Sequence, residues 1–249
     1  MKHRPIFVAG AMVAVATMLA CVACNSSPSA YRLEPTVVTP NDVVDFKQLY
    51  GQNCAGCHGA DGKGGAAIAL ANPVFLAIAD DSVIRRIASN GVPGTPMPAF
   101  AQSAGGMLTE KQIDAIVSGI RSWAKPDAPG DPTPPSYTAQ FPGDPQRGAD
   151  AYRTYCSSCH GADGRGGTKA SSIVDGSYLA LVSDQQLRTV VIAGRPELGA
   201  PDWRGDVEGR PMSAQDISDV VAWLSSQRPK FPGQPYPTIA ANPAQGGVQ

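Results

Sequence analysis

A five-residue motif, Cys-x-x-Cys-His, occurs twice in this chain and constrains its fold more than any other feature. The first copy occupies residues 54–58 and the second occupies residues 156–160. The chain has three histidines: one in each copy of the motif, and His3, which lies in a leader that we expect to be removed. Both copies are followed by Gly-Ala-Asp-Gly. The fold must therefore bring two thiols and one imidazole together at two separate places.

The Cys-x-x-Cys-His pattern is the attachment signature of c-type haem. Two thiols at this spacing form thioethers to one porphyrin, and the adjacent histidine is delivered to the iron. The sequence therefore predicts two covalently attached haem c groups, held by Cys54, Cys57, His58, Cys156, Cys159 and His160. The alternatives are redox dithiols or one four-cysteine zinc site. Neither explains why a histidine follows each cysteine pair.

The composition suits small domains built around a bulky cofactor. The chain has 249 residues, which is enough for one large or two small domains. Charged residues make up 16%, and there are 27 glycines and 23 prolines. The formal net charge of −1 gives no basic face for nucleic acid, so we expect no such partner.

The first residues are typical of a secretory signal. A basic start at residues 1–4 precedes an uncharged run over residues 6–23. That run is also near the short limit of a membrane-spanning helix. The small residues before Cys24, and the Ser-rich stretch after it, resemble the lipobox of bacterial lipoproteins, with Cys21 as the second candidate for acylation. We therefore predict that residues 1–24 are a signal peptide or lipid anchor, and that the protein is membrane-anchored at the periplasmic, extracytoplasmic face of a bacterial membrane.

The remainder of the chain is a tandem duplication with a shift of about 102 to 104 residues. Each copy ends in a predicted amphipathic helix that opens with a capping box, at residues 109–112 and 213–216. The first copy is also expected to open with a helix that begins near Asp42. The predicted segments are a tether (25–40), a first domain (41–124), a proline-rich linker (125–143), a second domain (144–228) and a disordered tail (229–249).

Each copy resembles a class I cytochrome c. In the first copy, residues 91–100 read Gly-Val-Pro-Gly-Thr-Pro-Met-Pro-Ala-Phe, which has the Met-Pro-x-Phe pattern of that family. The resemblance implies an all-α fold of two tandem domains, each with a few helices around one covalently bound haem. It also implies that a methionine before the last helix is the second axial ligand, so the first iron is expected to be ligated by His58 and Met97.

The second copy departs from this pattern at the methionine. Alignment of Gly194 with Gly91 places Ala200 at the position of Met97, and alanine cannot bind iron. Met212 is the remaining methionine of this copy and is the candidate ligand. Its counterpart in the first copy is Leu108, so it is equally a candidate for packing before the helix cap. An open or water-bound iron, or ligation by Lys169, stays possible.

The resemblance implies a function in electron transfer rather than catalysis. We expect a membrane-tethered dihaem c-type cytochrome that carries single electrons between respiratory or photosynthetic complexes. Its partners would be a quinol-oxidising complex and a terminal oxidase or soluble cytochrome. One alternative is a haem enzyme or a sensor of gas or peroxide, with a five-coordinate second haem fed by the first. The other is a permanent cytochrome subunit of a larger membrane redox complex.

Overall fold

The computed structural model describes residues 38–125, 130, 132–205, 207 and 209–230. The predicted signal or anchor, both candidate acylation sites, most of the tether and all but the first residues of the tail lie outside this part of the chain. No helix within the described residues is both long enough and apolar enough to cross a bilayer. Almost all of the duplicated part lies in one compact unit that begins at Val43.

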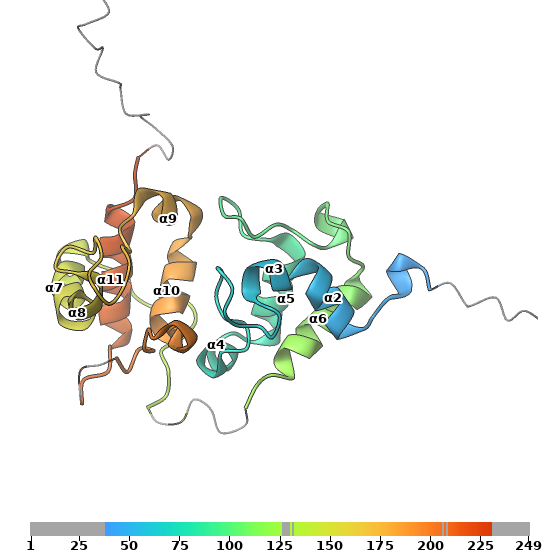
Figure 1. The fold of residues 1–249 in the computed structure, drawn as a ribbon, viewed down its shortest axis with the longest axis horizontal. Helices are drawn as coiled ribbons and strands as arrows, with labels where there is room; N and C mark the ends of the chain where they lie inside the picture. The colour runs from blue at the N-terminus through green and yellow to red at the C-terminus, as the bar shows by residue number, and fades with distance from the viewer. Residues whose placement is uncertain (1–37, 126–129, 131, 206, 208, 231–249) are drawn as a thin grey trace, which may run out of the picture. The chain divides into compact units, whose positions relative to one another are not determined.

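The first half of the duplicated part, residues 41–124, is helical (Figure 1). Its elements are the short 3₁₀ helices η1 (Pro40–Asp42) and η2 (Gln102–Ala104), and the α-helices α2 (Phe46–Asn53), α3 (Ala55–His58), α4 (Pro73–Ile78), α5 (Asp81–Asn90) and α6 (Glu110–Arg121).

The second half, residues 144–228, repeats the order of the five α-helices, with one short 3₁₀ helix between the fourth and the fifth. Its elements are α7 (Pro145–Tyr155), α8 (Ser157–His160), α9 (Gly176–Leu181), α10 (Asp184–Ala193), η3 (Pro196–Leu198) and α11 (Ala214–Ser226). Within the described residues, β-structure is limited to isolated bridges. The all-α fold predicted from the sequence is therefore confirmed.

Side-chain caps set where the first and last helices begin. The capping boxes predicted for the last helices are confirmed: Thr109 with Gln112 opens α6, and Ser213 with Asp216 opens α11. The first helix starts later than expected, because the Asp45 side chain accepts a hydrogen bond of 2.8 Å from the amide of Gln48 and caps α2 at Phe46.

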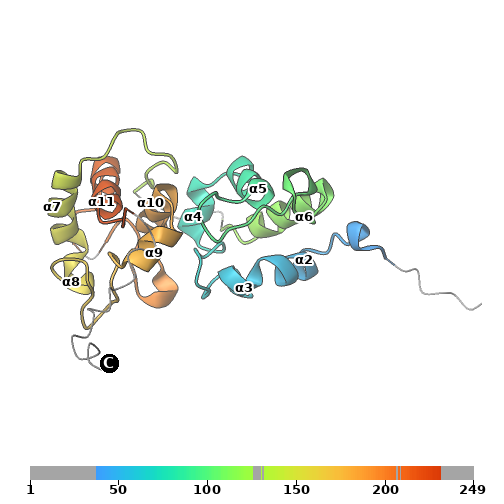
Figure 2. The same cartoon turned by 90° about the horizontal axis from the view of Figure 1, so that it is seen from above.

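The first and last helices of each half pack against each other, α2 with α6 and α7 with α11 (Figure 2). Glycine permits the close approach in both pairs. A Cβ atom on Gly119 of α6 would lie 2.0 Å from the Phe46 ring, and one on Gly148 of α7 would lie 2.0 Å from the carbonyl oxygen of Asp219. The Cys-x-x-Cys-His segment follows directly after the first helix of each half.

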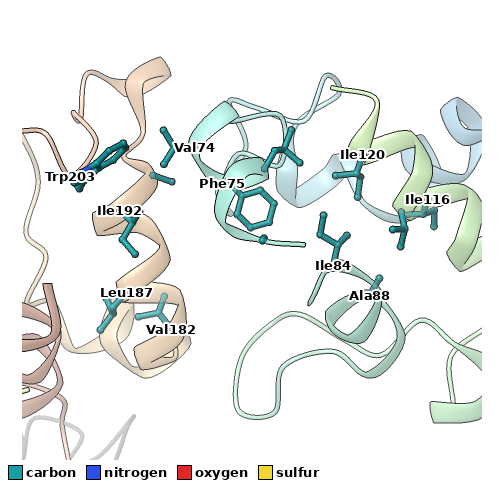
Figure 3. Close-up of a cluster of buried hydrophobic side chains, with 14 of the residues drawn as sticks. Val74, Phe75, Ile84, Ala88, Ile116, Ile120, Val182, Leu187, Ile192 and Trp203 are labelled. Atoms are coloured by element: carbon teal, nitrogen blue, oxygen red, sulfur yellow. The ribbon is translucent and has the colours of Figure 1, made fainter. Parts of the chain in front are cut away.

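The buried apolar side chains come from every long helix. Val74 and Phe75 belong to α4, while Leu187 and Ile192 belong to α10, and Figure 3 shows these residues with Trp203. Helices α4 and α10 also contact each other. The buried side chain of Asn72 caps α4 through two backbone amides and donates a 2.8 Å hydrogen bond to the carbonyl of Ala193, at the end of α10.

An arginine at the end of each last helix forms hydrogen bonds with the short helix in the middle of its half. Arg121 donates to the carbonyls of Leu76 (2.5 Å) and Ala79 (2.6 Å) and pairs with Asp81 at 2.6 Å. Arg228 repeats this pattern. It donates to the carbonyls of Leu179 (2.9 Å) and Val182 (3.0 Å) and pairs with Asp184 at 2.8 Å. Each guanidinium thereby satisfies carbonyls that a short helix leaves without partners at its C-terminus.

Candidate functional site

The two Cys-x-x-Cys-His segments form one-turn helices that continue directly from the first helix of each half. Cys54 ends α2, where its amide donates to Tyr50, and it also begins α3. Cys156 has the same place between α7 and α8. Because the motif is helical, its two cysteines and its histidine, at positions i, i+3 and i+4, lie on one face of a single turn, as attachment to one flat macrocycle requires.

The histidines are oriented by backbone carbonyls. Nδ1 of His58 lies 2.8 Å from the carbonyl oxygen of Ile68, and Nδ1 of His160 lies 2.8 Å from that of Ser171. A carbonyl oxygen only accepts, so each Nδ1 carries the proton and each Nε2 keeps its lone pair. A fixed tautomer with Nε2 available is the arrangement expected of a metal-ligating histidine.

The two histidines differ in their surroundings. The His58 residue is buried, with 7% of its surface exposed, whereas His160 is partly exposed. Burial lowers the pKa of His58, against the effect of its hydrogen bond to Ile68, and the positive charge of Arg195 lowers it further. A neutral imidazole is the form that binds iron, so this environment fits an axial ligand.

Among the described residues, the four motif cysteines form no disulfide. Burial, and to a smaller extent the neighbouring Cys57, raises the pKa of Cys54 to about 11; burial and Cys159 raise that of Cys156 to about 11. Among the described residues, no group of three or more His, Cys, Asp or Glu converges as a metal site. The alternative of one four-cysteine zinc site is therefore not assembled, and the residues fit two separate haem attachments.

The loop after each histidine is held by a tyrosine from the first helix. The hydroxyl of Tyr50 donates to the carbonyl of Gly59 at 2.9 Å, and that of Tyr152 donates to the carbonyl of Gly161. Burial is the main cause that raises the pKa of Tyr152 to about 12. Burial also raises the pKa of Tyr50, and by more. Both hydroxyls therefore stay protonated and can donate. Gly59 has φ of 84°, and a Cβ there would lie 1.8 Å from the carbonyl oxygen of Lys63, so the turn requires glycine.

The predicted sixth ligands lie in the segment before each last helix. Met97 is partly exposed, and its carbonyl accepts from the amide of Val92 at 3.0 Å. Ala200 is also partly exposed. Met212, which directly precedes the N-cap of α11, is instead buried in the core, with only 6% of the residue exposed. The roles of Met97 and Met212 as ligands stay predictions.

The groups that orient the histidines carry no signal in the sequence. The carbonyls of Ile68 and Ser171 belong to the backbone, so no residue type marks them, and they become visible only as equivalent positions of the duplication. The carbonyls bound by the arginines at the ends of the last helices are also backbone groups, so these contacts could not be predicted from the sequence either.

Two helical repeats, each with a Cys-x-x-Cys-His turn whose histidine is held ready to bind a metal, define a tandem c-type cytochrome. The chain belongs to the family described as cytochrome c oxidase, cbb3-type, subunit III, whose model matches residues 41–118 and again residues 143–224. The predicted relationship to cytochrome c domains is thus confirmed, and both domains with their cysteine pairs imply two haem c groups.

Curated relatives come from two kinds of respiratory complex. A cytochrome bc1 complex cytochrome c subunit of Mycobacterium tuberculosis is 27% identical over 183 residues, which covers 72% of this chain and 61% of that protein. The cbb3-type cytochrome c oxidase subunit CcoP of Azospirillum sp. is 29% identical over 141 residues, or 52% of this chain and 42% of that protein. The chain therefore spans less than two thirds of the length of these relatives.

Among solved structures, the reducing HAO-like protein complex of Kuenenia stuttgartiensis matches with a TM-score of 0.45 and 20% identity. The match covers 77% of this chain and 97% of that chain.

Proposed function

We propose that this protein is a dihaem c-type cytochrome that carries single electrons along a respiratory chain at a membrane. The observation that carries the proposal is the repeated geometry of His58 and His160, each with Nδ1 2.8 Å from a backbone carbonyl oxygen and each directly after a pair of cysteines that form no disulfide. Haem supplies reversible one-electron exchange when bound. The chain supplies covalent attachment, a fixed proximal ligand and a protein shell around the group.

The surroundings of the two sites support different reduction potentials. His58 lies in a buried setting, and the thioether of Met97 would favour the reduced iron and raise its potential. His160 is more exposed, and Ala200 stands at the position equivalent to Met97. Solvent exposure and ligand identity both shift a haem potential. Two unequal sites in one chain would give electron flow a direction.

The partners we propose are a quinol-oxidising complex and a terminal oxidase, because the relatives are named as subunits of a bc1 complex and of a cbb3 oxidase. Those names also favour a second candidate, a permanent subunit of such a complex. Anchoring through Cys24, or else through Cys21 or the apolar run before it, would hold the domains at the extracytoplasmic face.

Deletion and complementation in the producing organism test the electron-transfer function. Membranes that lack the protein should lose most of their quinol-dependent oxygen uptake, and the full chain should restore it. A Cys54→Ala, Cys57→Ala variant should not restore it, because the first haem is no longer attached. Unchanged oxygen uptake in the deletion membranes would overturn the proposal.

Purification from detergent-solubilised membranes decides between a carrier and a permanent subunit. A tagged full chain that is a subunit should retain oxidase or bc1 polypeptides through a high-salt wash, whereas a carrier should be recovered alone. A Cys24→Ala variant is the control for anchoring, and it should move the protein from the membrane to the soluble fraction if this cysteine is acylated.

A further inference from the structure

The loops that precede the last helices start and close in the same way in the two halves. Helices α5 and α10 end at glycines of nearly equal conformation, Gly91 (φ 66°, ψ −166°) and Gly194 (φ 63°, ψ −174°). One residue later, an amide donates at 3.0 Å to the carbonyl of Met97 in the first half and to that of Ala200 in the second. The backbone thus confirms that Ala200 occupies the place of Met97.

The same comparison gives Met212 a different place. Its amide donates to the carbonyl of Trp203 at 2.8 Å, as the amide of Leu108 donates to the carbonyl of Phe100 at 2.7 Å. Each of the two residues directly precedes the N-cap of the last helix, and each is 6% exposed. Met212 therefore fills the position of a core leucine, and its thioether is already packed among apolar side chains.

Iron ligation by Met212 would require its side chain to leave this core position. Trp203, which accepts the backbone hydrogen bond of Met212, is also held in place. It is only 2% exposed, and its own amide donates to the carbonyl of Ile192 at 3.1 Å. Withdrawal would open a cavity beneath the start of α11 in a region that is otherwise closely packed.

The other side chains near this site that could ligate the iron either form hydrogen bonds within the protein or lie on the same side as His160. Both carboxylate oxygens of Asp202 accept from Arg204, at 2.6 to 3.2 Å. Lys169 is exposed and lies two residues before Ser171, whose carbonyl orients His160. It therefore belongs to the proximal loop. The chain has no further histidine beyond His3 and the two motif histidines.

We propose that His160 is the single protein ligand of the second haem iron, and that its distal position binds a small π-acceptor diatomic molecule when the iron is reduced. The inference rests on the proposed attachment of two haems, and it adds a ligand-binding site to one of them. Met212 is then a core residue, and the loss of a methionine at position 200 is what leaves the site accessible.

Carbon monoxide titration of the reduced, purified full chain tests the proposal, with the haem content measured in the same sample. We expect two haems and one carbon monoxide per chain, seen as an optical difference spectrum that saturates at this ratio. Ala200→Met should restore the sixth ligand and abolish binding. Met97→Ala, the matched control in the first half, should raise the ratio from one to two.

Met212→Leu separates the two roles of this methionine. Leucine is the residue at the equivalent position 108, so the variant should fold and still bind one carbon monoxide. If the wild-type protein binds none and Met212→Leu binds one, Met212 is the ligand and the proposal is overturned. A saturated ratio of zero in both proteins, with two haems present, would overturn it as well. Fewer than two haems per chain would instead overturn the proposed attachment on which it rests.

Discussion

At the crossing of its first and last helices, the first half packs the ring of Phe46 against Gly119 of the last helix, whereas the second half packs Gly148 of the first helix against the backbone of Asp219 and the Cβ of Trp223. Phe46 and Gly148 both lie eight residues before the first motif cysteine, and Gly119 and Trp223 both lie ten residues after the N-cap of the last helix. A large residue and a small residue have exchanged places between two equivalent positions.

The exchange shows what a duplicated fold must keep. In each half a large side chain stands at one of these positions and glycine at the other, and the two halves differ in which helix carries the large residue. The contacts that result are not equal. Trp223 stacks on Tyr152, with ring centroids 4.3 Å apart, whereas Trp123 meets Tyr50 edge-on at 5.1 Å. Positions 97 and 200 differ in chemistry instead, because a thioether side chain stands at one and a methyl group at the other.

The largest effect is expected from Gly148→Ala. Its new Cβ would lie 2.0 Å from the carbonyl oxygen of Asp219, and a helical backbone atom cannot move aside without shifting α11. We expect the free energy of unfolding of the second half to fall by about 3 kcal/mol. Denaturant unfolding, with hydrogen exchange of peptides from α7 and α11, measures it.

Gly119→Ala is the matched variant in the first half. Its Cβ would meet the ring of Phe46, a side chain that can rotate away, and alanine is the better helix former by about 1 kcal/mol. The loss should therefore be about 1 kcal/mol or less, and a Phe46→Ala background should remove it. Equal losses for Gly148→Ala and Gly119→Ala would show that the two crossings are not built in opposite ways.

The terminal arginines are expected to have equal effects in the two halves. Arg121→Ala and Arg228→Ala each remove a donor from two carbonyls and one carboxylate. Each should lower the free energy of unfolding by about 2 kcal/mol, because the carbonyls lose their partners. The corresponding lysine variants should recover little, since an ammonium group does not reproduce the planar fork. Thermal unfolding of the four variants gives the comparison, and an effect confined to one half would contradict it.

The sequence revealed those parts of the fold that depend on neighbouring residues. The motif turns, the capping boxes at Thr109 and Ser213 and the all-helical class follow from short patterns and from the duplication. The hydrogen bonds of Arg121 and Arg228 could not be predicted in this way, because the carbonyls that Arg121 binds lie 42 and 45 residues away in the chain. Backbone acceptors leave no residue type to read, and only the folded chain shows that Arg188 is buried and donates to the carbonyls of Ser136 and Tyr137.

In the candidate site, the haem attachment residues are predicted directly by the motif. The sequence alone was less informative about the two positions from which a sixth ligand could come. Alignment placed Ala200 opposite Met97, and the backbone hydrogen bonds agree. It also placed Met212 opposite Leu108 without deciding between ligation and packing, because a methionine serves either role and burial is a property of the fold.

A further difference between the halves is a carboxylate that the first half lacks. Asp219 and Ala115 both lie six residues after the N-cap of the last helix. Asp219 accepts from Arg147 at 2.8 Å, from the amide of Asp144 at 2.7 Å and from Gln215 at 2.8 Å. Burial alone would raise its pKa, but these hydrogen bonds outweigh burial and lower the pKa below its ordinary value.

A lowered pKa in the folded state means that the carboxylate stabilises the second half above its unfolded pKa of about 4, and that this contribution is lost as pH falls through the folded value. Asp219→Asn should therefore cost about 1.5 kcal/mol at pH 7, since a charged hydrogen bond network is weakened. The difference from wild type should shrink at pH 3. Urea unfolding at both pH values measures it. The first half has Ala115 at this place, so its hydrogen exchange should not respond to the substitution. A difference that is the same at pH 7 and pH 3 would mean that Asp219 acts through shape rather than through its charge.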